Sequence, residues 1–324
     1  MNNKVIIDTN VFYSILGIYE NPKISNELLN NYEKYITTVT LYESIIKNRN
    51  NSNNIKIITN SIINRDINLI EIGYMPFCNQ DIYSLNSLNN LNNLIDDLLN
   101  FKIKQESEFA RWFFFQIIII TVGVFSKVDE YSFNDKLKNE KFQEEIKTLF
   151  ESYEFTILDE FKLTLEKAYE EDNTQKLFDE LFYSKMKEIL SKFIELYYKI
   201  SDNLTSYNND KIIKNYLSGI NILLSKDKYL DSINEHLNYF IKEFESNFYY
   251  GKINNKARRF INAKLKKIFV NKAKFFKNDI CDFLNIFAIS DDFTILSLDK
   301  KYINIIKGVD EKSYNLIKEL GYIK

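Results

Sequence analysis

The scarcity of glycine and proline is the feature of this sequence that most limits the folds open to it. The chain has 324 residues, of which only 7 are Gly and 2 are Pro. Turn-rich all-β sandwiches and collagen-like repeats are therefore disfavoured, and long helices are favoured. The 26 Phe and 22 Tyr supply enough apolar surface for a sizeable core. The length predicts two domains, or one domain with a large insertion.

The same counts exclude several common kinds of binding site. The glycines lie too far apart to form a GxGxxG or Walker A loop. One histidine, His236, and two cysteines, Cys78 and Cys281, cannot build a zinc finger or a His/Cys metal cluster. Catalysis by this chain would depend on carboxylates, hydroxyls, Lys or Tyr.

The overall charge indicates no particular class of partner. With 43 basic and 45 acidic residues the formal net charge is -2, which favours neither nucleic acid nor a membrane. The two distant cysteines, and an N-terminal segment without a signal-peptide hydrophobic region, predict a cytoplasmic protein. The apolar run from Trp112 to Phe125 is shorter than the roughly 20 residues that a bilayer requires. We expect it to be a buried helix and expect no membrane partner.

Two kinds of hydrophobic pattern divide the chain. Residues 1–75 and 255–324 alternate short apolar runs with helical spacing, which is typical of βα units around a parallel sheet. Residues 76–254 are almost continuously compatible with helix. We expect an α/β core assembled from the two terminal segments, with residues 76–254 as an all-α insertion. The expected strands are 4–7, 36–39, 67–72 and 293–298, and the expected helices of the core include 9–16, 25–35, 40–47, 279–290, 300–307 and 311–320.

Four carboxylates occur near the junctions between predicted strands and helices. Ligands collect at the carboxyl ends of the strands in an open parallel sheet, because loops and helix N-termini converge there. Acids gathered at that edge repel one another unless a hard cation such as Mg²⁺ lies between them. Metal ions held in this way activate water and stabilise the oxygens of a phosphodiester displacement. The four residues are Asp8, Glu43, Asp282 and Asp299.

Each acid also has a structural explanation. Asp8 and Asp299 are suitable N-caps, and Thr40 with Glu43 matches a capping box. Asp282 is expected near the start of a helix, where it would favour the macrodipole. These explanations are sufficient for each residue alone, but caps do not require an acid at every junction on one edge.

Four segments of the sequence resemble the PIN-domain family of ribonucleases, in the right order and with suitable spacing. They are KVIIDTNVFYSIL, TTVTLYESI, NDICDFLNI and TILSLDKKYI. The resemblance implies a PIN-like three-layer α/β/α core, with an acidic Mg²⁺ or Mn²⁺ site that cuts RNA. It matches Asp8, Glu43, Asp282 and Asp299 to the four acids of the family, which act as catalytic residues and metal ligands. It also matches Asn10 and Ser297 to polar positions that support the first and last acids.

Two features modify what the resemblance implies. Asp279 lies three residues before Asp282 on the same helical face, and is expected either to add a metal ligand or to be the better-aligned acid. The resemblance covers residues 1–75 and 255–324 only, because compact members of the family lack an insertion such as 76–254. The catalytic class is therefore implied, whereas the substrate and the regulation are left open.

One segment carries a dense local positive charge. Residues 252–277 contain ten Lys or Arg and no acid, with apolar residues interleaved at helical spacing. Such a helix can neutralise a phosphate backbone. A solvated face that balances the acidic insertion and a membrane-surface helix are the alternatives. The candidate nucleic-acid contacts are Lys256, Arg258, Arg259, Lys264, Lys266, Lys267 and Lys274.

The sequence thus predicts a divalent-metal-dependent endoribonuclease that uses Mg²⁺ or Mn²⁺. The alternative is a non-catalytic PIN-like scaffold that binds RNA or a protein partner through the helical insertion. DNA is not excluded as the substrate, because nothing in the sequence reads the 2′-hydroxyl. A protein partner such as an antitoxin at the insertion, and a homodimer, also remain open.

Overall fold

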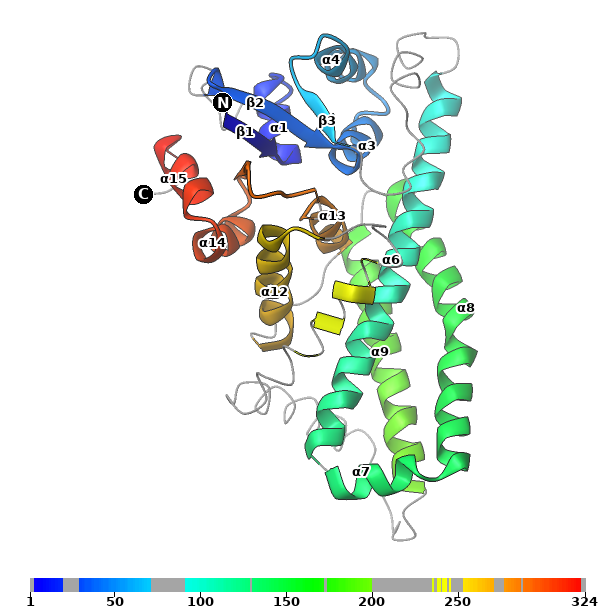
Figure 1. The fold of residues 1–324 in the computed structure, drawn as a ribbon. Helices are drawn as coiled ribbons and strands as arrows, with labels where there is room; N and C mark the ends of the chain where they lie inside the picture. Colours follow the sequence, from blue (N-terminus) through cyan, green and yellow to red (C-terminus); the bar gives the residue numbers. More distant parts are fainter. Residues whose placement is uncertain are drawn as a thin grey trace. The chain divides into compact units, whose positions relative to one another are not determined.

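The computed structural model describes residues 3–19, 29–70, 91–128, 130–171, 174–199, 235, 238–239, 241–243, 245, 253–270, 277–286 and 288–321. These residues are mostly helical, with a small, all-parallel, four-stranded sheet flanked by helices (Figure 1). The chain divides into two compact units. The first comprises 1–102, 241–265 and 281–324, and the second comprises 103–240 and 266–280. The two terminal segments of the chain therefore belong to one unit.

The sheet of the first unit has the strand order β3-β2-β1-β4. Its strands are β1 (Asn3–Ile7), β2 (Tyr32–Thr37), β3 (Asn68–Ile70) and β4 (Phe293–Leu296). The β1 strand is central, and Val5, Ile6 and Ile7 are all buried, as expected for a parallel strand that is covered on both faces. Ile7 of β1 pairs with Leu296 of β4. The strand order reverses at β1, because β2 lies on one side of it and β4 on the other.

The helices that follow β1, β2 and β4 each begin at a polar cap. The α1 helix (Thr9–Ile15) follows β1, α3 (Thr38–Lys47) follows β2, and α14 (Lys300–Val309) follows β4. The caps are Asp8, Thr37 and Asp299, whose side chains accept hydrogen bonds from backbone N–H groups of the first turn. The unit also contains α4 (Ser52–Ile63) and α15 (Glu311–Glu319). The polar residues that follow the strands are therefore fixed in position by the helices they initiate.

Two further helices contribute buried apolar side chains and one of the acids to the first unit. The α12 helix (Asn255–Val270) buries Phe260, Ile261 and Leu265 along its apolar stripe. The α13 helix (Lys277–Ile286) carries Asp282, and its Cys281 packs in a small apolar cluster with Val39. Only the portions of these helices within residues 241–265 and 281–324 belong to the first unit.

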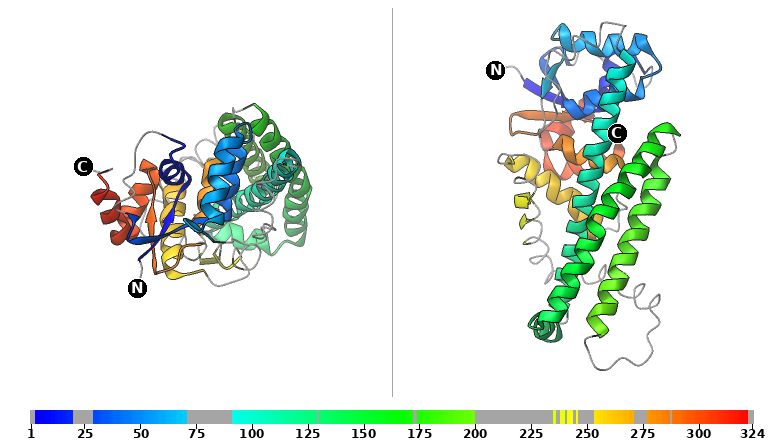
Figure 2. Two further views of the ribbon diagram at one scale, coloured as in Figure 1. Left: turned by 90° about the horizontal axis from the view of Figure 1, so that it is seen from above. Right: turned by 90° about the vertical axis from the view of Figure 1, so that its right-hand side faces the viewer.

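The second unit is helical. It contains most of α6 (Leu91–Val128), together with α7 (Glu130–Leu137), α8 (Glu140–Glu170) and α9 (Thr174–Lys199). The α8 and α9 helices lie side by side as a hairpin (Figure 2). Phe114 contacts Phe161 and Phe182 edge to face, with ring centroids 6.0 and 5.4 Å apart.

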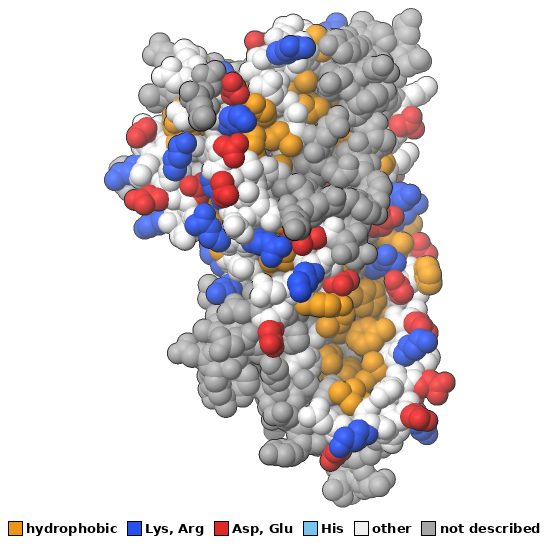
Figure 3. Space-filling view, viewed as in Figure 1, with side chains coloured by type: hydrophobic (Ala, Val, Ile, Leu, Met, Phe, Trp, Pro, Cys, Tyr) orange, Lys and Arg blue, Asp and Glu red, His pale blue; other side chains and the backbone are white. Residues whose placement is uncertain are grey.

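The surface of α8 carries charged side chains, whereas the apolar run of α6 is partly buried. Exposed ion pairs such as Lys147–Glu151 lie along α8, and acidic and basic side chains are interspersed on the visible face (Figure 3). The apolar run is helical and is buried only in part, since Phe113 and Ile118 are fully buried whereas Ile119 is 41% exposed. Among the described residues, no helix is both long enough and apolar enough to cross a bilayer.

The observed elements correct several local predictions. The second strand runs from Tyr32 to Thr37, so the helix predicted over 25–35 and the strand predicted over 36–39 are both wrong at their ends, because Tyr32 pairs with Asn3 of β1 and α3 begins at Thr38. Thr37 caps α3, so Glu43 is the sixth residue of that helix and not part of a capping box. Asp282 is likewise the sixth residue of α13, which begins at Lys277, so it does not lie at the helix start.

Candidate functional site

A small cavity of about 40 Å³ lies where β1 and β4 end, and we call it the acidic pocket. It contains three of the four acids that the sequence singles out: Asp8, Asp282 and Asp299. The strands that precede Asp8 and Asp299 are hydrogen-bonded neighbours. The full lining is Ile6, Ile7, Asp8, Thr40, Asp282, Asn285, Ile289, Ile295, Ser297, Asp299 and Tyr302.

Asp8 is held at the pocket by the end of β1 and by Ser297. Its Oδ1 accepts a hydrogen bond from Val11 N at 3.0 Å, and its own N–H donates to Leu296 O at 3.1 Å. The hydroxyl of Ser297, which is completely buried, donates to Asp8 Oδ2. Ser297 Oγ also accepts from the backbone N–H of Asp299 at 3.1 Å. One buried hydroxyl therefore links two acids that are far apart in the sequence.

Asp299 is more exposed than Asp8. It caps α14, and its Oδ1 accepts hydrogen bonds from Lys301 N at 2.6 Å and Tyr302 N at 3.2 Å. Both N-cap interpretations from the sequence are correct, and both residues also line the acidic pocket. Capping and a functional role are thus compatible here, because the cap uses Oδ1 in each residue. Asn10, the second residue of α1, is exposed.

Asp282 reaches the pocket from α13 and carries a basic partner. Its Oδ2 lies 2.6 Å from Lys264 Nζ, and the same ammonium lies 5.0 Å from the centre of the Phe283 ring. Asn285, one turn further along α13, accepts a hydrogen bond at Oδ1 from the hydroxyl of Thr37. Asp282 and Asn285 are therefore both fixed at the lining of the pocket by polar contacts from other elements.

Two side chains of the pocket lining, Asp8 and Tyr302, have raised pKa values, chiefly because they are buried and secondarily because of the neighbouring carboxylates. The pKa of Asp8 is raised to about 6, chiefly by burial and to a smaller extent by the negative charges of Asp282 and Asp299, although hydrogen bonds from Ser297 and Val11 oppose the shift. The pKa of Tyr302 lies well above its usual value, because of burial first and then Asp282 and Asp8. Tyr302 is therefore a neutral hydroxyl group at neutral pH.

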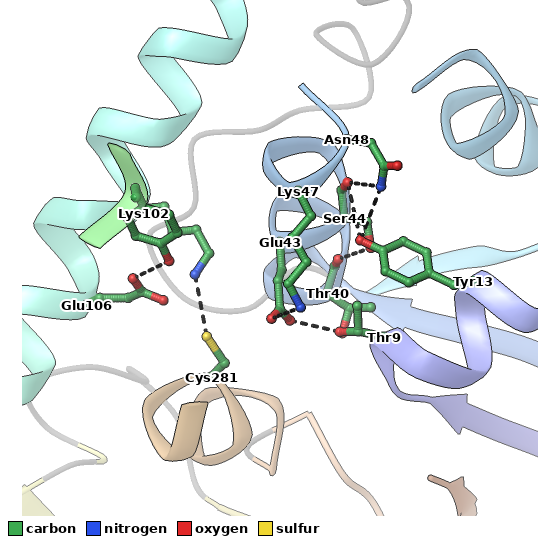
Figure 4. Close-up of polar contacts among 11 residues, drawn as sticks. Thr9, Tyr13, Thr40, Glu43, Ser44, Lys47, Asn48, Lys102, Glu106 and Cys281 are labelled. Atoms are coloured by element: carbon green, nitrogen blue, oxygen red, sulfur yellow. Dashed lines mark hydrogen bonds and ion pairs between the residues drawn. The ribbon is translucent and has the colours of Figure 1, made fainter. Parts of the chain in front are cut away.

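Glu43, the fourth predicted acid, is not among the residues that line the pocket. Its carboxylate accepts a hydrogen bond from Thr9 Oγ1 at 2.8 Å and forms an ion pair with Lys47 Nζ at 2.9 Å (Figure 4). Burial acts to raise the pKa of Glu43, but the positive charges of Lys47 and Lys102 outweigh it, so the pKa is lowered. The expected group of four acids is thus three at the pocket and one ion-paired beside α1.

Lys47 and Lys102 are positively charged neighbours of Glu43 that the sequence patterns did not single out. Lys47 lies four residues after Glu43 on the same helix, which is a recognisable ion-pair spacing. Lys102 comes from α6 and has no local signal. Its Nζ lies 3.5 Å from the Sγ atom of Cys281, which is buried (Figure 4).

The acidic pocket fits a hard divalent cation by the chemistry of its donors. Carboxylate and hydroxyl oxygens are the ligands that Mg²⁺ prefers, and Mg²⁺ is usually held by one or two carboxylates together with water and substrate phosphate. Asp8 and Asp299 supply two such carboxylates at one edge of the sheet. The described residues hold no group of three or more His, Cys, Asp or Glu arranged to bind a metal ion. The side chain of Asp279 lies outside the described residues.

The basic segment is less available to a nucleic acid than its composition indicates. Lys256 is buried and lies 2.5 Å from Asp310, and Lys264 is buried against Asp282. Arg258 forms an ion pair with Glu245 at 2.6 Å. These three residues were expected on an exposed cationic face, but their partners lie elsewhere in the chain. Of the other candidates, Arg259 and Lys266 are exposed, Lys267 is half-buried, and Lys274 lies outside the described residues.

Comparison of the chain with protein-family models, with curated proteins and with solved structures found no match. The chemistry of the acidic pocket and of the residues around it is therefore the basis for a functional assignment.

Proposed function

We propose that this chain is a divalent-metal-dependent endoribonuclease that hydrolyses RNA phosphodiester bonds at the acidic pocket. The observation that carries the proposal is the link between Asp8 and Asp299 through Ser297, at the carboxyl ends of two adjacent parallel strands. The strand order adds support, because ligands of open α/β sheets bind where the order reverses, and here it reverses at β1. We also propose that the core has the PIN-like three-layer α/β/α fold.

The residues of the pocket have distinct roles in this proposal. Asp8 and Asp299 would hold Mg²⁺ or Mn²⁺, with Asp282 beside them. When bound, the ion would supply Lewis-acid chemistry and neutralise charge at the scissile phosphate. Ser297 keeps the Asp8 carboxylate oriented through its hydrogen bond. Tyr302, which stays neutral, presents a hydroxyl donor at the same lining.

Substrate binding would depend on charge outside the pocket. The exposed Arg259 of α12 is available to the phosphate backbone, whereas Lys256 and Lys264 are engaged within the protein. Such contacts are independent of sequence and weaken with salt. By the resemblance to PIN ribonucleases, the products would carry 5′-phosphate and 3′-hydroxyl ends.

The experiment that tests the proposal is a calorimetric titration with Mn²⁺, paired with cleavage of a labelled single-stranded RNA. We expect saturable Mn²⁺ binding at the two pocket carboxylates. We also expect RNA cleavage that EDTA abolishes, because hydrolysis at the pocket would require the bound ion. The Asp292→Asn variant is a matched control, since Asp292 is an exposed acid immediately before β4, at the opposite end of the strand from Asp299. Cleavage that continues in EDTA would contradict the proposal.

A non-catalytic scaffold is the second candidate, and one observation favours it. Two of the four acids already have lysine partners, in the pairs Lys264–Asp282 and Lys47–Glu43. A scaffold need not bind metal, so the absence of Mn²⁺ binding together with binding of RNA or a protein would support it.

A further inference from the structure

Lys264 places a buried positive charge at the acidic pocket. Its side chain is 6% exposed, whereas that of Asp282 is 44% exposed, and their charged atoms are 2.6 Å apart. A buried ammonium is costly unless it is paired, so this contact fixes the position of the lysine. The charge of Lys264 therefore acts on the pocket from within the protein, through Asp282.

The net charge of the side chains around the pocket determines how much positive charge a bound cation can bring. Asp8, Asp282 and Asp299 supply three carboxylates to the lining, and Lys264 compensates the one on Asp282. The two that remain, on Asp8 and Asp299, match the charge of one divalent ion. Glu43 adds no further negative charge to this balance, because Lys47 is its partner.

We propose that the acidic pocket takes a single divalent ion, at Asp8 and Asp299, and that the ammonium of Lys264 replaces a second one at Asp282. The inference rests on the proposed function and specifies its site. Two-metal sites place their ions about 3.5–4 Å apart as a clamp on both reacting oxygens. Here Asp282 Oδ2 is already in contact with Lys264, so a second ion would have to compete with a fixed ammonium. Lys264 is thus a positioning residue that acts through Asp282.

The test is the number of Mn²⁺ ions that the full chain binds, measured by calorimetry and by electron paramagnetic resonance of free Mn²⁺. We expect one ion for the unaltered protein. Lys264→Met keeps the apolar stem but removes the charge, so the stoichiometry should rise from one to two. Lys264→Arg keeps the charge and should stay at one. Lys266→Met is the matched control, because Lys266 is an exposed lysine two residues further along α12.

Three results would overturn the inference. The first is two ions in the unaltered protein, and the second is one ion in a folded Lys264→Met variant. The Lys264→Met/Asp282→Asn double variant removes both charges and serves if the single variant does not fold. The double variant should still bind one ion. The third result that would overturn the inference is a folded double variant that binds none. The absence of any ion from the unaltered protein would instead remove the metal site, and the proposed function with it.

Discussion

The Asp8→Asn variant is expected to lose metal-dependent RNA cleavage by about 10²–10³-fold while its fold becomes more stable. The loss follows because Asp8 is one of the two carboxylates that would hold the ion. Asparagine has the same shape and retains an oxygen that can accept the hydrogen bond from Val11 N, so α1 keeps its cap. Initial rates of RNA cleavage at saturating Mn²⁺ measure the first part of this expectation.

The gain in stability follows from the pKa of Asp8. Burial, together with Asp282 and Asp299, raises this pKa from 3.8 to about 6, so the folded state holds the proton more tightly than the unfolded state. The free energy of unfolding therefore falls as the pH rises from about 4 to about 6, and stays lower above that range. At 1.36 kcal/mol per pKa unit, the ionised Asp8 costs at most about 3 kcal/mol at neutral pH. Asparagine cannot ionise, so the variant avoids this cost. Its amide nitrogen replaces Oδ2 and cannot accept the hydrogen bond from Ser297, which offsets about 1 kcal/mol of the gain.

Urea denaturation in EDTA at pH 4 and at pH 7.5 measures the second part. The Asp8→Asn variant should be more stable than the unaltered protein at pH 7.5, and the difference should nearly vanish at pH 4. Asp292→Asn, the exposed control at the start of β4, should change neither cleavage nor the pH dependence. Full cleavage activity in the Asp8→Asn variant would exclude the acidic pocket as the catalytic site.

The Asp310→Ala variant is expected to lower the free energy of unfolding by about 3–5 kcal/mol, because it leaves a buried charge without its partner. The side chains of Lys256 and Asp310 are 5% and 8% exposed, and their charged atoms lie 2.5 Å apart. Asp310 also caps α15, where it accepts hydrogen bonds from the N–H and hydroxyl groups of Ser313. Lys256 donates to the carbonyl of Phe293 in β4, so the pair fastens α12 to the sheet.

An exposed ion pair provides the comparison for this prediction. Lys138 and Asp135 are each 76% exposed, and Asp135→Ala should change the free energy of unfolding by less than about 1 kcal/mol. In the Lys256→Met/Asp310→Ala double variant no buried charge is left unpaired, so its loss should be smaller than the sum of the two single losses. Equal effects of Asp310→Ala and Asp135→Ala in urea denaturation would contradict a structural role for the buried pair.

The parts of the fold that depend on local pattern could be predicted from the sequence. An apolar run followed by an acid indicated both β1 with its capped helix and β4 with its capped helix. Both junctions are as expected, with Asp8 and Asp299 as the caps. The register between β1 and β4 then brings the two acids to one pocket, as the placement of acids at strand ends implied.

The parts that depend on distant partners could not be predicted. Residues 252–277 contain no acid, so their lysines were expected to face solvent. Lys256 and Lys264 are instead buried, and they form ion pairs with Asp310 and Asp282 from other segments. Glu43 was placed with the other acids because it follows a strand. The ion pair with Lys47 was readable from the spacing, but the charge of Lys102 on α6 was not.

The hydrogen bond from Ser297 to Asp8 can form only late in the synthesis of the chain. Synthesis on the ribosome proceeds from the N-terminus, so Asp8 emerges long before β4 and Ser297, the residue that follows it. Until that late strand has been made and has paired with β1, Asp8 lacks its buried donor and has no second carboxylate beside it. A nascent chain of this protein therefore cannot possess the acidic pocket, and any activity located there can begin only once synthesis has passed Asp299.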